Sequence, residues 1–79
     1  MLEVLIPEVG VEGEQLKVTE WYKQEGEKVI KGELLLAVSS GKANFEIEAP
    51  YTGILKKIIA PVGERVERGV LVAYIEEES

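Results

Sequence analysis

The sequence has no cysteine, no histidine and no aspartate among its 79 residues. The absence of cysteine and histidine excludes disulfides, thiol chemistry and zinc sites of the usual kind. It also removes the commonest general base, so the chain cannot assemble the usual set of nucleophile, base and orienting residue. We therefore expect a protein that is not itself an enzyme and that holds no metal.

Positive charge is also scarce. Nine Lys and Arg residues stand against fifteen acidic residues, all of them Glu, and the formal net charge is −6. This balance argues against a nucleic-acid-binding protein, which needs cations to face the phosphates. It also disfavours binding to anionic membranes. It fits a soluble protein that meets basic partner surfaces.

Long hydrophobic runs are missing as well. No apolar stretch approaches the roughly 20 residues that span a bilayer, and the chain begins with a strand-like run in place of a charged leader. The length predicts one small domain, residues 1–79, which buries about 60% of its unfolded surface.

The apolar residues occur in short runs, often β-branched or alternating, which are separated by Gly, Pro and Glu-Gly pairs. This spacing predicts an all-β protein with no helix of useful length. Trp21, in the second run, is expected to pack against the body of the sheet rather than to bind a partner. The runs are 4–6, 16–22, 34–38, 45–47, 54–59 and 70–75.

The two halves of the chain repeat each other at a spacing of 37 residues. At the start of each half, residues 6–10 match residues 49–53 at a larger spacing of 43. The first half therefore carries six additional residues after Gly10. Two similar β halves predict two sheets that pack face to face about a pseudo-twofold axis. The additional segment, 11–16, predicts a protruding loop, and Gly26 and Gly63 are expected to have positive φ in equivalent turns. The matched pieces are 6–10 with 49–53, 26–29 with 63–66, Gly32 with Gly69, Leu34 with Leu71 and Val38 with Ile75.

One turn is different from the others. Residues 39–44, Ser-Ser-Gly-Lys-Ala-Asn, lie between two strand-like runs, which predicts a hairpin with Lys42 at or beside its tip. A phosphate-binding loop is excluded, because Leu36 and Ala43 occupy positions where that motif needs Gly and Ser or Thr. The repeat pairs this turn with the end of the chain, so the tip and the terminus should lie on opposite sides of the molecule. By itself, a lysine in such a turn is usually only a solvated side chain.

Over nearly its whole length the chain resembles the lipoyl domains of 2-oxo acid dehydrogenase acyltransferase components. The resemblance rests on six pieces in the family's order and spacing, and Ser40-Gly41-Lys42-Ala43 falls where the family has Asp-Lys-Ala. The family's aspartate is therefore replaced by Gly41. The subtype that this sequence resembles is the branched-chain or acetoin type. The pieces are 6–10, 20–29, 32–35, 40–43, 46–53 and 63–69.

The resemblance implies a flattened barrel or sandwich of two four-stranded sheets, and lipoate attached to Lys42 as a swinging arm. Gly41 and Ala43 would be the flanking recognition residues. The implied partners are a lipoate-attaching enzyme, a thiamin-dependent 2-oxo acid decarboxylase, an acyltransferase core and dihydrolipoamide dehydrogenase. The domain itself would be monomeric. It would be cytoplasmic in a prokaryote, or in the mitochondrial matrix if it is excised from a eukaryotic protein.

Some alternatives remain open from the sequence. A biotinyl carrier shares the fold, but that family brackets its lysine with methionines, and the only methionine here is Met1. The other alternative is an interaction module that carries no modification. It stays open because Gly41 replaces the aspartate that the family has before its lysine. The inserted loop is either a solvated loop or a segment that the decarboxylase reads, and 76–79 is either a frayed end or the start of a linker. The loop residues are Val11, Glu12, Gly13, Glu14 and Gln15.

Overall fold

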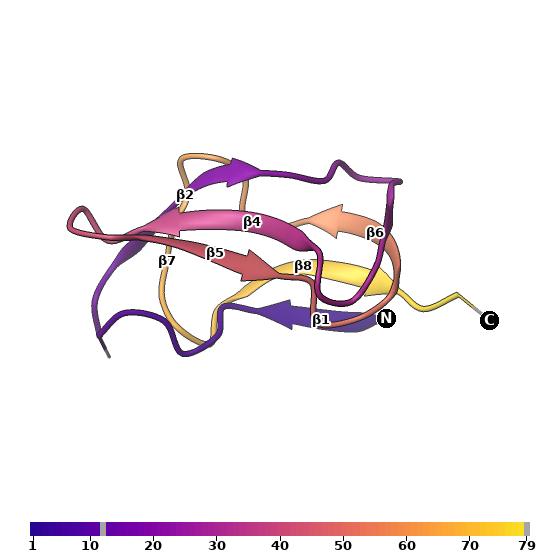
Figure 1. Cartoon of the computed structure of the whole chain (residues 1–79), viewed down its shortest axis with the longest axis horizontal. Coiled ribbons are helices and arrows are strands. Elements are labelled where there is room, and N and C mark those ends of the chain that lie inside the picture. The colour runs from indigo at the N-terminus through magenta and orange to yellow at the C-terminus, as the bar shows by residue number, and fades with distance from the viewer. Residues whose placement is uncertain (12, 79) are drawn as a thin grey trace.

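The computed structural model describes residues 1–11 and 13–78. Eight strands make up two antiparallel four-stranded sheets, with the orders β1-β8-β6-β3 and β5-β4-β2-β7 (Figure 1). The predicted all-β sandwich is confirmed. The strands are β1 (Leu2–Leu5), β2 (Leu16–Trp21), β3 (Lys28–Val29), β4 (Leu34–Ser39), β5 (Asn44–Glu48), β6 (Gly53–Ile58), β7 (Arg65–Val66) and β8 (Leu71–Glu76).

The two halves form equivalent structures. Strands β1, β2, β3 and β4 correspond to β5, β6, β7 and β8, respectively. When each strand is replaced by its counterpart, the strand order of one sheet becomes that of the other. Equivalent hydrogen bonds join the halves in both directions: the Gly26 amide donates to the Leu55 carbonyl over 2.7 Å, and the Gly63 amide donates to the Val18 carbonyl over 2.8 Å. Both glycines have positive φ, 93° and 96°. The predicted pseudo-twofold arrangement is therefore present in the backbone.

The sequence patterns missed two strands. The segments containing Lys28–Val29 and Arg65–Val66 were expected to be turns, but each adds a two-residue strand at the edge of a sheet. A strand of two residues is too short to show alternation, so its pairing is decided by the neighbouring strand.

The core lies between the sheets and is built from Val, Leu, Ile and Ala. The central strands β4 and β8 supply side chains with no exposed area, including Leu35, Val38, Val72 and Ile75. Among the described residues no polar or charged residue is buried. A dry, close-packed core of this kind gives the two sheets a fixed relative position. It therefore forms a rigid base for the loops at either end.

Trp21 contributes to this base. Its ring packs against the core cluster, and its indole N–H donates to the Ala60 carbonyl over 2.8 Å. The bond joins β2 in one sheet to the connection that follows β6 in the other. Trp21 thus has the structural role that the sequence predicted.

The molecule is elongated, with a longest extent of 39 Å. The β4–β5 turn lies at one end of this axis, and the N-terminus and the end of β8 lie at the other (Figure 1). This is the arrangement expected from the repeat. The described residues contain no helix that is long and apolar enough to cross a membrane.

Candidate functional site

The β4–β5 turn is a tight hairpin. Ser39 and Asn44 are the last paired residues of the ladder, and the Ser40 amide donates to the Ala43 carbonyl over 2.9 Å. Gly41 and Lys42 are therefore the two central residues of the turn. Gly41 has φ of 92°, and no described residue other than glycine has positive φ. A positive φ is readily adopted by glycine and only rarely by residues with a Cβ, so the backbone of the tip favours glycine at this position.

Two serine hydroxyls hold the backbone of the tip. The Gly41 amide donates to Ser39 Oγ over 3.1 Å. Ser40 Oγ accepts from the amides of Lys42 and Ala43 over 3.4 and 3.2 Å. Short polar side chains commonly bond to backbone amides in turns. This role was not predicted, although the Ser-Ser-Gly sequence carries the signal for it.

Lys42 occupies the second central position of this turn, and it is exposed, as are Gly41 and Ala43. In the described part of the chain its ammonium group forms no ion pair. Lysine combines an acylable amine with a long flexible stem. The structure therefore presents one amine at the far end of a rigid body, on a backbone whose course is defined.

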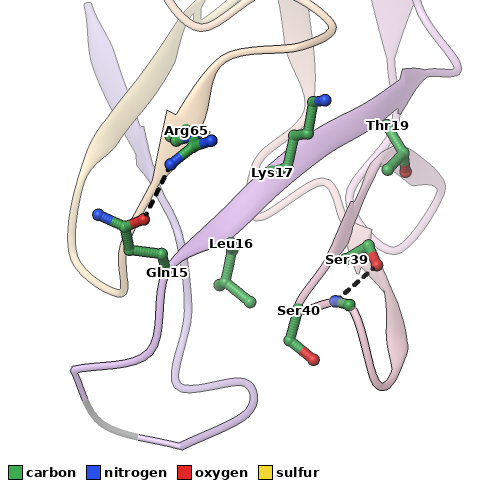
Figure 2. A pocket seen from close by; sticks show the side chains of 8 residues that line it. Gln15, Leu16, Lys17, Thr19, Ser39, Ser40 and Arg65 are labelled. Atoms are coloured by element: carbon green, nitrogen blue, oxygen red, sulfur yellow. Dashed lines mark hydrogen bonds between the residues drawn. The ribbon is translucent and has the colours of Figure 1, made fainter.

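The inserted loop lies at the same end of the molecule as the Lys42 turn (Figures 1 and 2). Its first turn is closed by the Glu14 amide, which donates to the Val11 carbonyl over 3.0 Å, and Gly13 has φ of 82°. Gly10, just before the loop, packs close to the ring of Phe45 on β5. Glu12, which belongs to the predicted recognition loop, lies outside the described residues.

A groove of about 310 Å³ separates β2 from the tip (Figure 2). Gln15, the last residue of the inserted loop, lines it together with Gly41, so the loop and the Lys42 turn share one surface. Gln15 Oε1 also accepts a 3.4 Å hydrogen bond from Arg65. The sequence did not predict this groove. Its lining residues are Gln15, Leu16, Lys17, Thr19, Ser39, Ser40, Gly41 and Arg65.

Next to the tip, the outer face of the second sheet carries acidic residues. The Tyr22 hydroxyl donates to Glu46 Oε2 over 3.1 Å. This hydrogen bond raises the pKa of Tyr22, and partial loss of hydration and the charges of Glu46 and Glu20 act in the same direction. Glu46 lies on β5, two residues beyond the end of the tip. The surface beside Lys42 is thus divided into an acidic region and the groove with its cations.

Metal ligands do not gather at this end. Across residues 1–11 and 13–78, no group of three or more His, Cys, Asp or Glu side chains is placed to hold a metal ion.

Comparison with known proteins places the chain in a family. The family model described as "Biotin-requiring enzyme", which represents the biotinyl/lipoyl attachment domain, matches residues 2–75. The chain therefore belongs to the biotinyl/lipoyl attachment domain family.

More particularly, it is similar to lipoyl-bearing acyltransferases. It is 34% identical over 79 residues to the dihydrolipoyllysine-residue succinyltransferase component of the 2-oxoglutarate dehydrogenase complex of Staphylococcus saprophyticus, a match that covers 100% of this chain and 19% of that protein. It is 38% identical over 74 residues to the dihydrolipoyllysine-residue acetyltransferase component of the acetoin cleaving system of Bacillus subtilis, covering 94% of this chain and 19% of the relative. The chain thus spans about a fifth of the length of these relatives.

A solved structure agrees with this assignment. The lipoyl domain of the 2-oxoglutarate dehydrogenase complex from Azotobacter vinelandii superposes with a TM-score of 0.78, over 100% of both chains and at 24% identity. At that identity the likeness shows the fold. Together with the family and the curated relatives, it confirms the predicted resemblance to the lipoyl domains of 2-oxo acid dehydrogenase acyltransferase components.

Proposed function

We propose that this domain is a swinging-arm carrier and that lipoate is attached to the Nζ of Lys42. One observation carries the proposal: Lys42 occupies a central position of an exposed hairpin that favours glycine beside it, at the end of the molecule opposite the N-terminus and the end of β8. A group attached there is directed away from the point where a linker to other domains would join. The family membership of residues 2–75 supports a covalent cofactor at such a lysine.

In this proposal the domain does no chemistry itself. The dithiolane of the lipoyl arm would accept an acyl group at a thiamin-dependent decarboxylase, deliver it to coenzyme A at an acyltransferase, and be reoxidised by dihydrolipoamide dehydrogenase. The domain would contribute recognition and proximity, because tethering replaces diffusion with an effective concentration that reaches the millimolar range for short flexible linkers. Gly41 and Ala43 flank the proposed acceptor in sequence, and together with the loop 11–15 they are proposed as the recognition surface.

Intact-mass spectrometry after incubation with a lipoate-attaching enzyme tests the proposal. We expect the chain to gain the mass of one lipoyl group. Lys42→Ala should abolish the gain, and Lys57→Ala, which removes another exposed lysine, should not. Exchanging Lys42 and Ala43 should also abolish it, because the turn directs only the second central position toward the enzyme.

A parallel incubation with a biotin-attaching enzyme separates lipoyl from biotinyl carriers. We expect no biotinylation, since neither Gly41 nor Ala43 is the methionine that the biotinyl family places beside its lysine. Biotinylation without lipoylation would replace the proposal with the biotinyl alternative. The absence of both modifications would leave an unmodified interaction module.

A further inference from the structure

The groove beside the tip contains a row of cations and hydrogen-bond donors. Arg65 on β7 is the registered partner of Lys17 on β2, and Lys17 is the registered partner of Ser39 on β4. The three residues therefore form one transverse row across the sheet, just below the Lys42 turn. All three line the groove, and Figure 2 shows them on neighbouring strands.

The pairing of Lys17 with Arg65 is unfavourable in the absence of an anion. Like charges that are directly opposite each other on adjacent strands destabilise a sheet. Neither side chain forms an ion pair within the described residues, although the chain has fifteen glutamates. Lys31, Lys42 and Lys57 also form no ion pair within the described residues, whereas the four remaining cations each approach a glutamate oxygen to 3.2–3.8 Å. What sets Lys17 and Arg65 apart is that they are registered partners on adjacent strands.

The remaining hydrogen-bonding capacity of the groove also favours an anion. Gln15 uses its carbonyl oxygen to accept from Arg65, which leaves its amide N–H groups as donors. Ser39 Oγ already accepts from the Gly41 amide, which leaves its hydroxyl hydrogen to donate. The groove therefore presents Lys17, Arg65 and two neutral donors, and a ligand that meets them must supply several acceptor oxygens.

We propose that this groove binds the terminal carboxylate of an acyl group carried on the Lys42 arm, that is, an acyl group derived from a dicarboxylic 2-oxo acid. The inference rests on the proposed function and specifies its substrate class. A carboxylate has the required charge and acceptor oxygens, and the groove volume of about 310 Å³ is at the small end of ligand sites. An arm attached to Lys42 starts beside Gly41, which lines the groove. In this proposal the arm folds back over the tip, which brings its end to the groove.

Tethering makes such weak binding effective. Exposed ion pairs contribute little when both partners are free in solution, but a carboxylate on the same domain has a high effective concentration at the groove. An acyl group without a second carboxylate finds no charge partner there. The groove would thus bind acyl groups derived from dicarboxylic acids, which keep one free carboxylate, in preference to acyl groups derived from monocarboxylic acids.

The absence of cysteine allows a test that does not need lipoate. In the Lys42→Cys chain the introduced thiol is unique, and it can be alkylated with either of two arms of equal length, one ending in a carboxylate and the other in a primary amide. Backbone NMR signals of Lys17, Ser39 and Arg65 report occupation of the groove. A carbon-13 label in the carboxylate of the arm reports its protonation through the change of its chemical shift with pH.

We expect the carboxylate arm to shift these signals and the amide arm to leave them in place. The proton affinity of the arm carboxylate should be about threefold lower than on free cysteine, the small effect expected for cations in an exposed groove. Changing both Lys17→Gln and Arg65→Gln should abolish both effects without lowering the melting temperature, since it removes a like-charge pair. The matched double change Lys31→Gln and Lys57→Gln should preserve them.

Three results would overturn the inference: equal shifts with both arms, no shift with either arm, or shifts that survive loss of Lys17 and Arg65. Failure of the proposed function is recognised separately, because only the intact-mass experiment depends on attachment of lipoate to Lys42.

Discussion

The strongest prediction concerns Gly41 and uses Gly26 as a matched control. Both glycines have nearly equal positive φ, 92° and 93°, and a Cβ added at either would meet no other atom within 4 Å. The change to alanine therefore imposes nearly the same unfavourable φ on an L-residue at both positions, and the new Cβ meets no atom beyond the neighbouring residues. The two sites differ in place, because Gly41 is next to Lys42 whereas Gly26 lies in a different turn.

The magnitude follows from two opposing terms. An L-residue in a left-handed conformation costs about 1–2 kcal/mol, and replacing glycine with alanine lowers the entropy of the unfolded chain, which returns about 0.4–1 kcal/mol. The net loss of unfolding free energy is about 1 kcal/mol for each variant. For a domain of this size that corresponds to a fall in Tm of about 4–8 °C, measurable by circular dichroism on heating.

The two variants should differ in modification. Alanine disfavours the positive φ at the tip by about 1 kcal/mol, so we expect the kcat/KM of the lipoate-attaching enzyme to fall about fivefold for Gly41→Ala. Gly26→Ala should be modified at the wild-type rate below its melting temperature. An unchanged Tm for Gly41→Ala would refute the argument from φ. Equal slowing in both variants would show that general stability, and not the tip conformation, governs modification.

Three further predictions address recognition, packing and pH. Gly41→Asp restores the acid that lipoyl domains carry before their lysine. Its Tm should fall as for Gly41→Ala, while its reductive acylation by a decarboxylase should be faster than that of Gly41→Ala. Equal acylation rates for the two variants would show that the acid is irrelevant. Trp21→Phe loses the hydrogen bond to the Ala60 carbonyl and should lower the unfolding free energy by about 1 kcal/mol in urea titrations, with no change in modification; unchanged stability would contradict the role of that bond. Glu46→Gln should lower the pKa of Tyr22 toward its ordinary value in an ultraviolet pH titration, because the bond to Glu46 favours the protonated phenol. That stabilisation is complete below the ordinary tyrosine pKa and is lost as pH rises through the raised pKa, so a wild-type titration identical to that of the variant would refute it.

Sequence patterns predicted much of the fold because the signals are local. Alternating apolar residues indicated six of the eight strands, and the 37-residue repeat predicted the equivalence of the halves. Positive φ was predicted at Gly26 and Gly63 and found at both. Strands β3 and β7 were missed, because two residues carry no periodic pattern and pair only when the rest of the sheet is in place.

The candidate site was predicted in part. The position of Lys42 in the hairpin followed from the turn residues around it and from the family resemblance. The support that Ser39 and Ser40 give the tip was not predicted. The positive φ of Gly41 shows that this residue has a conformational role in addition to replacing the family's acid.

The sequence by itself therefore determined six of the eight strands, the repeat and the hairpin that carries Lys42, because each depends on side-chain alternation or on backbone preferences within a few residues. Only the tertiary structure decided which surface lies beside Lys42. Lys17, Ser39 and Arg65 are distant in sequence, and they form one row because β2 pairs with both β4 and β7. The inserted loop lies at the same end (Figure 1), and Gly10, which precedes it, lies near the ring of Phe45 on β5. Such contacts depend on how whole strands pair and pack, which no local pattern encodes.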